Sequence, residues 1–258
     1  MVVFAAQGDA RRSMALLWRE GASAQVKSGP RPALSVDEIV DAAIAIADAD
    51  GMAALSMRAV GDRLGRTAMA LYTYVPSKAE LLDLMVDRAL AELAGEYDLE
   101  AGWRAAATAF AEDLWTFYLR HPWQLQISYA RPVLGPGEFA LQETVLRILF
   151  ATGLPAHRVR WVLGSVFSLV RGSAQIAAEA RLAAREIDVS EEEWWYTRSG
   201  MLTELAPDLA ERFPMVTKLG GMEPDPDDCT PYLEREAWLT FEAGLQILFD
   251  GVEAAIAG

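Results

Sequence analysis

The sequence predicts an all-α fold, because apolar residues recur at helical spacing and glycine and proline fall between the periodic segments. We find no segment of alternating apolar and polar residues that would predict a strand. The pattern divides the chain into a largely flexible basic arm at residues 1–34 with room for one short helix, a three-helix helix-turn-helix at residues 35–80 and a larger helical domain at residues 81–258. A hydrophobic content of 52% over 258 residues is sufficient for a sizeable core.

The helix-turn-helix is delimited by residues that begin and end helices. Ser35 begins a capping box ahead of the first helix, and Gly51 is expected to end that helix. Ser56 opens a second helix, which Gly65 ends, and residues 67–74 then form a short third helix. Three closely spaced helices with a glycine turn between the last two are typical of a helix-turn-helix.

Longer helices are predicted in the remainder of the chain, separated by glycine and proline residues. They are expected at residues 77–93, 103–120, 137–152, 156–185, after Ser190 and at 231–257, with a Gly/Pro/Asp loop at 214–230.

The composition excludes several classes of protein. The N-terminus lacks a basic segment followed by an apolar core, and no apolar run is long enough to span a membrane, so we expect a cytoplasmic protein. The single cysteine, Cys229, excludes an intramolecular disulfide, and the acidic residues around it indicate an inert loop position. Only two histidines occur, His121 and His157, and their spacing assembles no metal site, so we expect neither metal nor cofactor.

Charge is distributed unevenly along the chain. The net charge of the whole protein is −14, yet residues 1–79 hold nine Lys/Arg and eight Asp/Glu, a net of +1, while residues 80–258 have a net of −15. An acidic body repels phosphates, so any contact with DNA must be made through a small and specific face.

The short third helix has the features of a helix that enters the major groove of DNA. Its small side chains permit close approach to the bases, and Leu71 is its single strongly buried anchor. The alternative is an ordinary helical corner with solvated side chains. The candidate DNA contacts in this region are Arg58, Arg66, Thr67, Ala68, Met69, Ala70, Tyr72, Thr73, Tyr74 and Lys78.

A resemblance to a known family supports the DNA-binding interpretation. The residues Ile39-Val40-Asp41-Ala42-Ala43, Gly51, Leu55-Ser56-Met57-Arg58-Ala59-Val60, Leu64-Gly65 and Leu71-Tyr72-Thr73-Tyr74-Val75-Pro76-Ser77-Lys78-Ala79-Glu80-Leu81-Leu82 resemble the tetracycline-repressor (TetR) family of regulators. The resemblance implies that Arg58, Ala68, Met69, Ala70, Tyr72, Tyr74 and Lys78 contact operator DNA. The chain departs from the family at Arg66-Thr67-Ala68, and it has Tyr74 at a position where histidine is common in the family. These differences leave the operator sequence open.

The second part of the chain resembles the C-terminal ligand domain of the tetracycline-repressor subgroup. The resemblance is carried by His121-Pro122-Trp123, Arg131-Pro132 and Leu134-Gly135-Pro136. In members of that subgroup a basic N-terminal arm can lie in the minor groove, which implies DNA contacts for Lys27 and Arg31. A disordered, merely solubilising arm is the alternative.

Aromatic residues concentrate after position 100 and offer the walls of a pocket for a small hydrophobic effector. Burial in an ordinary core is the alternative for each of them, and His121 is also interpreted as a helix-end residue that caps carbonyls. The candidate ligand-binding residues are Phe110, Trp115, Tyr118, His121, Phe139, Gln142, Trp161, Ser165, Ser168, Gln175 and Trp195.

Two long apolar helices are candidates for a homodimer interface, since small residues let such helices pair with their two-fold copies in a four-helix bundle. Burial within one subunit is the alternative. The candidate interface residues are Val162, Val166, Leu169, Val170, Ala237, Phe241, Leu245 and Leu248.

These features predict a repressor that leaves a palindromic operator when a small hydrophobic or aromatic molecule binds behind the helix-turn-helix and shifts the spacing of the two reading heads. The chain contains no G-x-S-x-G, phosphate-loop or G-x-G-x-x-G motif, so an enzyme is not expected. A helical protein–protein adaptor without DNA binding is the rival interpretation. The sequence does not decide between repression and activation.

Overall fold

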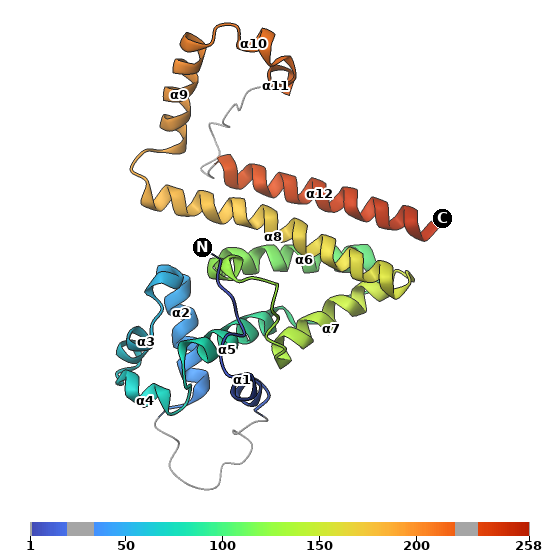
Figure 1. Ribbon diagram of the computed structural model, residues 1–258. Helices are drawn as coiled ribbons and strands as arrows, with labels where there is room; N and C mark the ends of the chain where they lie inside the picture. The colour runs from blue at the N-terminus through green and yellow to red at the C-terminus, as the bar shows by residue number, and fades with distance from the viewer. Residues whose placement is uncertain (1, 20–33, 220–231, 258) are drawn as a thin grey trace. The chain divides into compact units, whose positions relative to one another are not determined.

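The computed structural model describes residues 2–19, 34–219 and 232–257, and each of these ranges contains helices (Figure 1). Within these ranges the only β-type pairing is an isolated bridge between Val3 and Ile127. The all-α prediction is therefore confirmed for the described residues. The helices are α1 (Ala10–Leu17), α2 (Val36–Ala54), α3 (Met57–Leu64), α4 (Ala68–Tyr72), α5 (Lys78–Leu90), η1 (Ala91–Leu93), α6 (Trp103–Arg120), η2 (Pro122–Gln126), α7 (Pro136–Phe150), α8 (Ala156–Glu186), α9 (Glu191–Leu205), α10 (Leu209–Arg212), α11 (Pro214–Leu219) and α12 (Tyr232–Ala257).

Helices α2 to α4 begin at the capping residues that the sequence indicates. The Ser35 hydroxyl accepts from the Glu38 amide while the Glu38 carboxylate accepts from the Ser35 amide, which completes the capping box. Thr67 caps α4 through its hydroxyl. Helix α4 ends at Tyr72, two residues before the expected end at residue 74. Gly51 interrupts the helix as expected, because its backbone is non-helical at φ 76° and ψ 174°, and a short helical segment then continues to Ala54.

The turn between α3 and α4 depends on two glycines. Gly65 has φ 64° and ends α3 in the left-handed conformation that side chains with a Cβ disfavour. Gly61, inside α3, lies against the turn itself: a Cβ on Gly61 would stand 2.7 Å from the Arg66 carbonyl oxygen. Close approach of α3 to the backbone that leads into α4 therefore requires glycine at position 61.

The chain forms two compact units. The first comprises the residues up to 171 together with those from 244 onward, and the second comprises residues 172–243. In the second unit Arg181 pairs with Glu234 at 2.6 Å, and Ala237 and Phe241 are buried. The expected loop at 214–230 is wrong at its beginning, because residues 214–219 form α11; residues 220–230 lie outside the described residues.

The N-terminal segment contains α1, the one short helix for which its sequence has room, and hydrogen bonds connect this segment to α5. The Ala6 amide and the Ser13 hydroxyl both donate to the buried carboxylate of Asp83 on α5, at 2.7 and 2.8 Å. The Asp9 amide donates to Glu80 on the same helix. The arm is fixed because buried carboxylates of α5 accept its hydrogen bonds, and local sequence patterns carry no sign of such distant partners.

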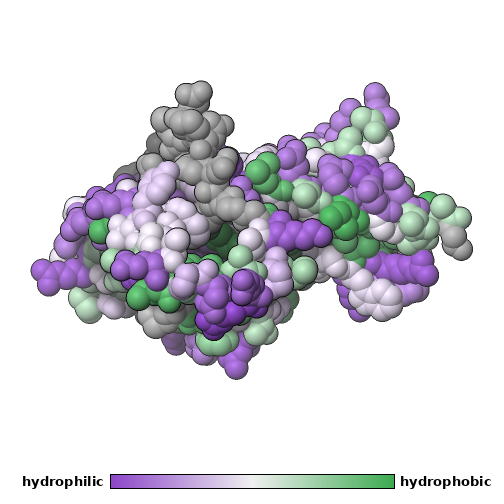
Figure 2. Space-filling view, turned by 90° about the horizontal axis from the view of Figure 1, so that it is seen from above, coloured by the Kyte–Doolittle hydropathy of each residue, from purple (hydrophilic) through white to green (hydrophobic). Residues whose placement is uncertain are grey.

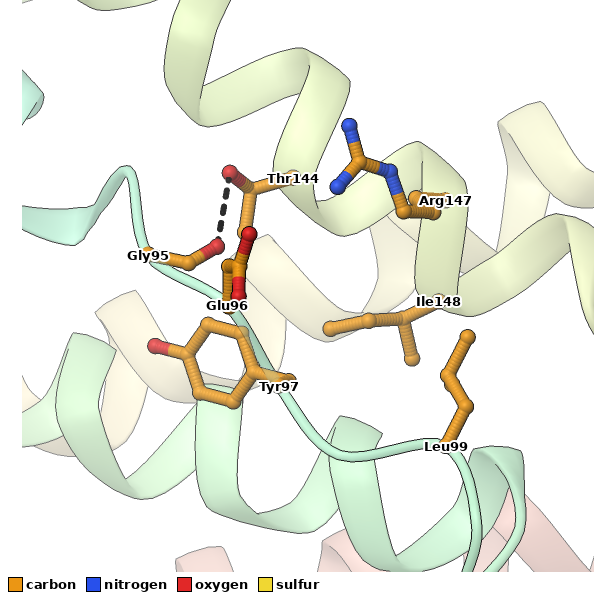
Figure 3. Close-up of a pocket in the computed structure, with 7 residues that line it drawn as sticks. All are labelled: Gly95, Glu96, Tyr97, Leu99, Thr144, Arg147 and Ile148. Carbon is orange, nitrogen blue, oxygen red and sulfur yellow. Dashed lines mark hydrogen bonds between the residues drawn. The ribbon is translucent and has the colours of Figure 1, made fainter.

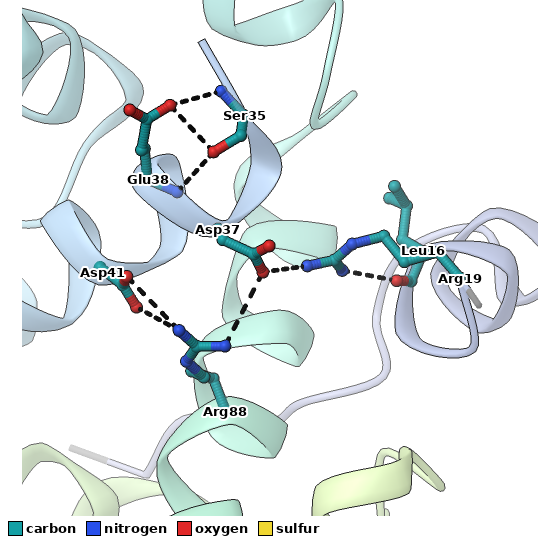
Figure 4. Close-up of polar contacts among 7 residues, drawn as sticks. All are labelled: Leu16, Arg19, Ser35, Asp37, Glu38, Asp41 and Arg88. Atoms are coloured by element: carbon teal, nitrogen blue, oxygen red, sulfur yellow. Dashed lines mark hydrogen bonds and ion pairs between the residues drawn. The ribbon is translucent and has the colours of Figure 1, made fainter. Parts of the chain in front are cut away.

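Charged side chains join α1, α2 and α5 at the surface of the first unit (Figure 4). Arg19, next to α1, donates to Asp37 on α2 at 2.5 Å. Arg88 on α5 lies 3.3 Å from Asp41 and 3.8 Å from Asp37. Exposed pairs of this kind contribute about 0–1 kcal/mol each, so they orient the helices more than they stabilise them.

The surface carries hydrophobic side chains among hydrophilic ones, as the face in Figure 2 shows in green and purple. No described helix combines the length and the apolar character that crossing a membrane requires. Two of the largest exposed apolar side chains of the first unit, Trp161 on α8 and Ile247 on α12, are 66% and 72% exposed.

Candidate functional site

Helix α4 presents an exposed face over a minimal anchor. Leu71 is its only buried residue, while Met69 is 75% exposed and Tyr72 also faces solvent. Thr67 and Thr73 are exposed at the two ends of the helix, and Tyr74 is half-buried. A short helix that buries one leucine and leaves its remaining face open is available for close contact with another molecule.

The charge of this region is opposite to that of the whole chain. Residues 55–78 contain four Lys/Arg and a single acidic residue, Asp62, in a protein of net charge −14. Arg58, Arg63 and Arg66 all belong to exposed positions on α3 or the turn after it. Arg58 lies 3.8 Å from Asp62, a surface pair that leaves its guanidinium accessible. This local positive charge can attract phosphates while the acidic remainder repels them.

The other predicted DNA contacts are placed less uniformly. Ala68 and Ala70 are half-buried on α4, and Lys78 is exposed. The ammonium group of Lys78 donates to the carbonyl oxygen of Leu55 at 2.6 Å and so fastens the start of α5 to the end of α2. Lys27 and Arg31 lie outside the described residues. Arg63 is a further exposed cation on α3 that was not among the predicted DNA contacts, although its charge and its position before the turn are visible in the sequence.

The predicted ligand-binding residues differ in burial and are divided between the two units. Four lie buried in the first unit, five lie on its surface, and Gln175 and Trp195 belong to the second unit. The buried set is Phe110, Trp115, Tyr118 and His121, and the exposed set is Phe139, Gln142, Trp161, Ser165 and Ser168. Helical spacing does not reveal which side of a helix faces a neighbour, so the grouping of these residues into one site stays a prediction.

His121 has a role that differs from the expected capping of carbonyls. It ends α6, and its ring contacts Asp48 on α2 at 2.7 Å and Glu92 in η1 at 3.3 Å. Burial of the ring tends to lower the pKa of His121, but the hydrogen bonds and charges of the two carboxylates outweigh this and raise the pKa overall. The Trp123 indole also donates to Asp48. His121 therefore ties α6 to the first helix of the helix-turn-helix.

A small cavity of about 130 Å³ opens beside the loop before α6 (Figure 3). Its polar lining includes Thr144 and Arg147 from α7, and the Thr144 hydroxyl donates to the carbonyl of Gly95. Tyr97 donates to Asp113 at 2.7 Å, and burial together with that carboxylate raises the pKa of Tyr97. The cavity is below the usual 300–1,000 Å³ of drug-sized ligand sites, and none of the predicted ligand residues lines it.

A larger apolar groove of about 450 Å³ lies between α8 and α12 within the first unit. Among the predicted dimer residues, Val162 and Leu248 line it, together with the exposed Trp161 and Ile247. Leu169 is half-buried, whereas Val166, Val170, Ala237, Phe241 and Leu245 are buried within the single chain. For these five the alternative of burial within one subunit holds, because they already contact their own chain and have no surface left for a partner.

Other polar residues of the site region were missed by pattern reasoning. The carboxylates Glu80, Asp83 and Asp87 are buried on α5, and burial is the main cause of the raised pKa of Asp83 and Asp87. Arg171 on α8 falls at helical spacing from Phe167 and Ala174, a signal that its side chain faces inward. Across the described part of the chain, no group of His, Cys, Asp and Glu residues is arranged to hold a metal ion.

Comparison with known proteins gives consistent matches along the chain. Residues 39–85 match the model of bacterial regulatory proteins of the tetR family, and residues 98–256 match the tetracyclin repressor-like C-terminal domain. The HTH-type transcriptional repressor DrrR1 of Streptomyces coeruleorubidus is 36% identical over 97% of this chain and 88% of its own length. An HTH-type transcriptional regulator of Saccharopolyspora erythraea is 35% identical over 60% of this chain and 64% of its own length.

Two solved structures of similar fold are those of ActR from Streptomyces coelicolor, without and with a ligand. Apo ActR superposes with a TM-score of 0.64 at 23% identity, over 87% of this chain and 99% of ActR. ActR in complex with actinorhodin superposes with a TM-score of 0.65 at 25% identity and the same coverage. Both similarities support the fold, and the second structure contains a bound small molecule.

Proposed function

We propose, from the premise that the chain belongs to the TetR family of bacterial regulatory proteins, that it represses transcription and leaves its operator when a small aromatic molecule binds. The observation that carries this proposal is the exposed, basic α3–α4 corner in an otherwise acidic protein. A protein that acts on the chromosome works in the cytoplasm, and that is where we place it.

Two reading heads are needed for a palindromic operator, so we infer a homodimer. The apolar groove between α8 and α12 supports this inference, because Trp161 and Ile247 expose large apolar surface at its edge. Two copies of these helices pairing about a two-fold axis would cover that surface as a four-helix bundle does.

Release of DNA requires a connection from the effector to α4. His121 supplies one at the end of α6, since it contacts both Asp48 on α2 and Glu92 after α5. A ligand that moves α6 would pull on the first helix of the reading head through these bonds. Half-sites on DNA lie about 34–36 Å apart, so a shift of a few ångströms per head weakens binding.

A mobility-shift assay on the DNA upstream of the gene tests the proposal. The wild-type chain should retard this DNA, and Tyr72→Ala should weaken binding by about tenfold or more, because it removes a contact from the exposed face of α4. Tyr196→Ala is the matched control, since Tyr196 is an exposed tyrosine on α9 in the other unit. A wild-type chain that shifts no DNA supports the rival function, a helical adaptor.

A further inference from the structure

Arg171 on α8 is a cation without a carboxylate. Its Nη2 atom donates to the carbonyl oxygens of Leu125 and Ile127, at 2.6 and 2.8 Å. Its Nη1 atom is buried and has no hydrogen-bond partner. No carboxylate of the described residues forms an ion pair with this guanidinium, whereas Arg104 on α6 pairs with Asp250 and Arg181 on α8 pairs with Glu234.

A buried charged donor whose N–H has no hydrogen-bond acceptor destabilises the fold unless a ligand supplies the acceptor. Leaving such a group unpaired costs free energy, and the cost is greater when the group is charged. The same cost becomes binding free energy when a ligand oxygen supplies the missing acceptor. An anionic oxygen is favoured over a neutral one, because it also neutralises the guanidinium and forms a charge-assisted hydrogen bond.

The ring of Tyr129 now lies where such a ligand would lie. The Arg171 Cζ atom stands 4.2 Å from the centre of that ring, in a cation–π contact. The Tyr129 hydroxyl contacts the hydroxyl of Tyr118, which is 1% exposed, while Tyr129 itself is 55% exposed. The ring of Tyr129, which bears an oxygen, is therefore exposed to solvent on one side and contacts a guanidinium and a buried phenol.

Tyr118 stays protonated at this position and can donate to a ligand oxygen. Burial raises the pKa of its hydroxyl well above the ordinary value, and the neighbouring Tyr129 adds to this, while Arg171 acts in the opposite direction. Two donors, the phenol and the guanidinium, thus face the place that the Tyr129 ring covers.

We propose that Arg171 and Tyr118 form a binding subsite for the acidic oxygen of a planar aromatic acid, and that this ligand displaces the side chain of Tyr129. The inference rests on the proposed function, since it names the chemical class of the effector. The ligand stacks its ring on the guanidinium in place of Tyr129, and its carboxylate or ionised phenol accepts from Nη1 and from the Tyr118 hydroxyl.

Displacement of Tyr129 has a path to the helix-turn-helix. The neighbouring residues are paired with the N-terminal segment, because the Val3 amide donates to the Gln126 carbonyl and the Ser128 amide donates to the Val3 carbonyl, both at 2.8 Å. Three residues after Val3, the Ala6 amide donates to Asp83 on α5. Movement of the segment around Tyr129 therefore reaches the helix that follows the reading head.

Calorimetric titration of the full chain with two matched probes tests the subsite. The probes are 3-hydroxy-2-naphthoate and its neutral amide, 3-hydroxy-2-naphthamide. We expect the acid to bind wild type at least tenfold more tightly than the amide, and Arg171→Gln to abolish that preference. Arg185→Gln, which removes an exposed arginine from the same helix, is the control and should keep the preference.

A second variant covers the case in which Arg171→Gln fails to fold. Tyr129→Ala removes the exposed ring that occupies the subsite, so it should bind the naphthoate at least threefold more tightly than wild type does. Equal affinity of wild type for acid and amide overturns the proposal, as does a preference that survives Arg171→Gln. Absence of binding by the acid up to about 1 mM, to wild type and Tyr129→Ala alike, also overturns it.

The same protein samples should be run in the mobility-shift assay with upstream DNA. A chain that binds DNA but shows no preference for the acid disproves the subsite and leaves the proposed function standing. A chain that prefers the acid but does not bind DNA disproves the proposed function and leaves the subsite standing.

Discussion

Helices α4 and α5 are separated by five residues and differ in how many residues they bury and in whether these include charged ones. Helix α4 buries Leu71 alone, whereas α5 buries nine residues, three of which are the carboxylates Glu80, Asp83 and Asp87. The first helix leaves its polar and small side chains to solvent. The second directs its three carboxylates inward, where backbone amides of the N-terminal segment and of α7 donate to them.

The difference separates recognition from positioning. A helix held by one leucine and by the turn before it can approach DNA closely, but it contributes little to its own stability. Helix α5 fixes where α4 stands, because it joins the N-terminal segment, α2 and α7 through hydrogen bonds between distant parts of the chain. Substitutions in the two regions should therefore have different effects on DNA binding and on unfolding.

The largest effect on stability is expected at the turn that presents α4. Gly61→Leu places a side chain against the Arg66 carbonyl oxygen, which is backbone and cannot move without displacing α4. We expect a loss of about 3 kcal/mol in the free energy of unfolding and loss of DNA binding. Urea unfolding followed by circular dichroism measures the first, and a mobility shift measures the second.

Gly200→Leu is the matched control, because Gly200 lies within α9 with open space around its Cα atom. It should unfold close to the wild-type urea concentration. Equal destabilisation by the two variants would mean that the close contact at Gly61 is not what holds α4.

A smaller loss is expected where α5 holds the N-terminal segment. Asp83→Ala leaves the Ala6 amide and the Ser13 hydroxyl without their acceptor, which we expect to cost about 2 kcal/mol, because burial of the charged carboxylate offsets part of what its hydrogen bonds contribute. Hydrogen exchange should show faster exchange in residues 2–19, while DNA binding persists. Glu143→Ala, at an exposed position of α7, should change neither measurement. Slow exchange of residues 2–19 in Asp83→Ala would contradict the role of Asp83.

The local parts of this comparison were predictable from sequence, and the long-range parts were not. Ser35, Gly65 and Thr67 act at a helix end within three residues of themselves, so their types alone disclose the boundaries. Asp83 and Ser13 meet across 70 residues, and acidic residues at helical spacing are read as a solvated face. The predicted DNA-contacting face rests on a local pattern, whereas the grouping of the predicted ligand residues depends on how helices pack, which a local pattern does not reveal.

A pH dependence is expected at the contact between α6 and α2. The folded pKa of His121 is raised, so its ion pairs with Asp48 and Glu92 stabilise the fold fully below the unfolded pKa of about 6.5 and are lost as the pH rises through the folded value. The urea midpoint of wild type should therefore fall as the pH increases above 6.5, relative to that of His121→Gln. His157→Gln, which changes an exposed histidine, should keep the wild-type profile. Parallel profiles for wild type and His121→Gln would show that these pairs do not titrate.

The smallest effect is expected at the surface ion pairs of α5. Arg88→Ala removes the pairs with Asp37 and Asp41, but all three side chains are about half exposed. Water screens such pairs, and the free energy of unfolding should change by less than about 1 kcal/mol. A change of more than 2 kcal/mol in thermal or urea unfolding would show that this network positions α2 on α5 far more strongly than exposed charges do.

Met69 offers the most direct test of whether α4 reads DNA. Met69→Glu adds a negative charge to an exposed position and should leave the urea midpoint unchanged. Its affinity for labelled upstream DNA, measured by fluorescence anisotropy, should be at least about a hundredfold weaker than that of wild type, because like charges at an interface cost several kcal/mol. Met201→Glu places the same charge on an exposed methionine of α9 and should bind as wild type does. Wild-type affinity in Met69→Glu would contradict the assignment of α4 as the helix that enters the groove.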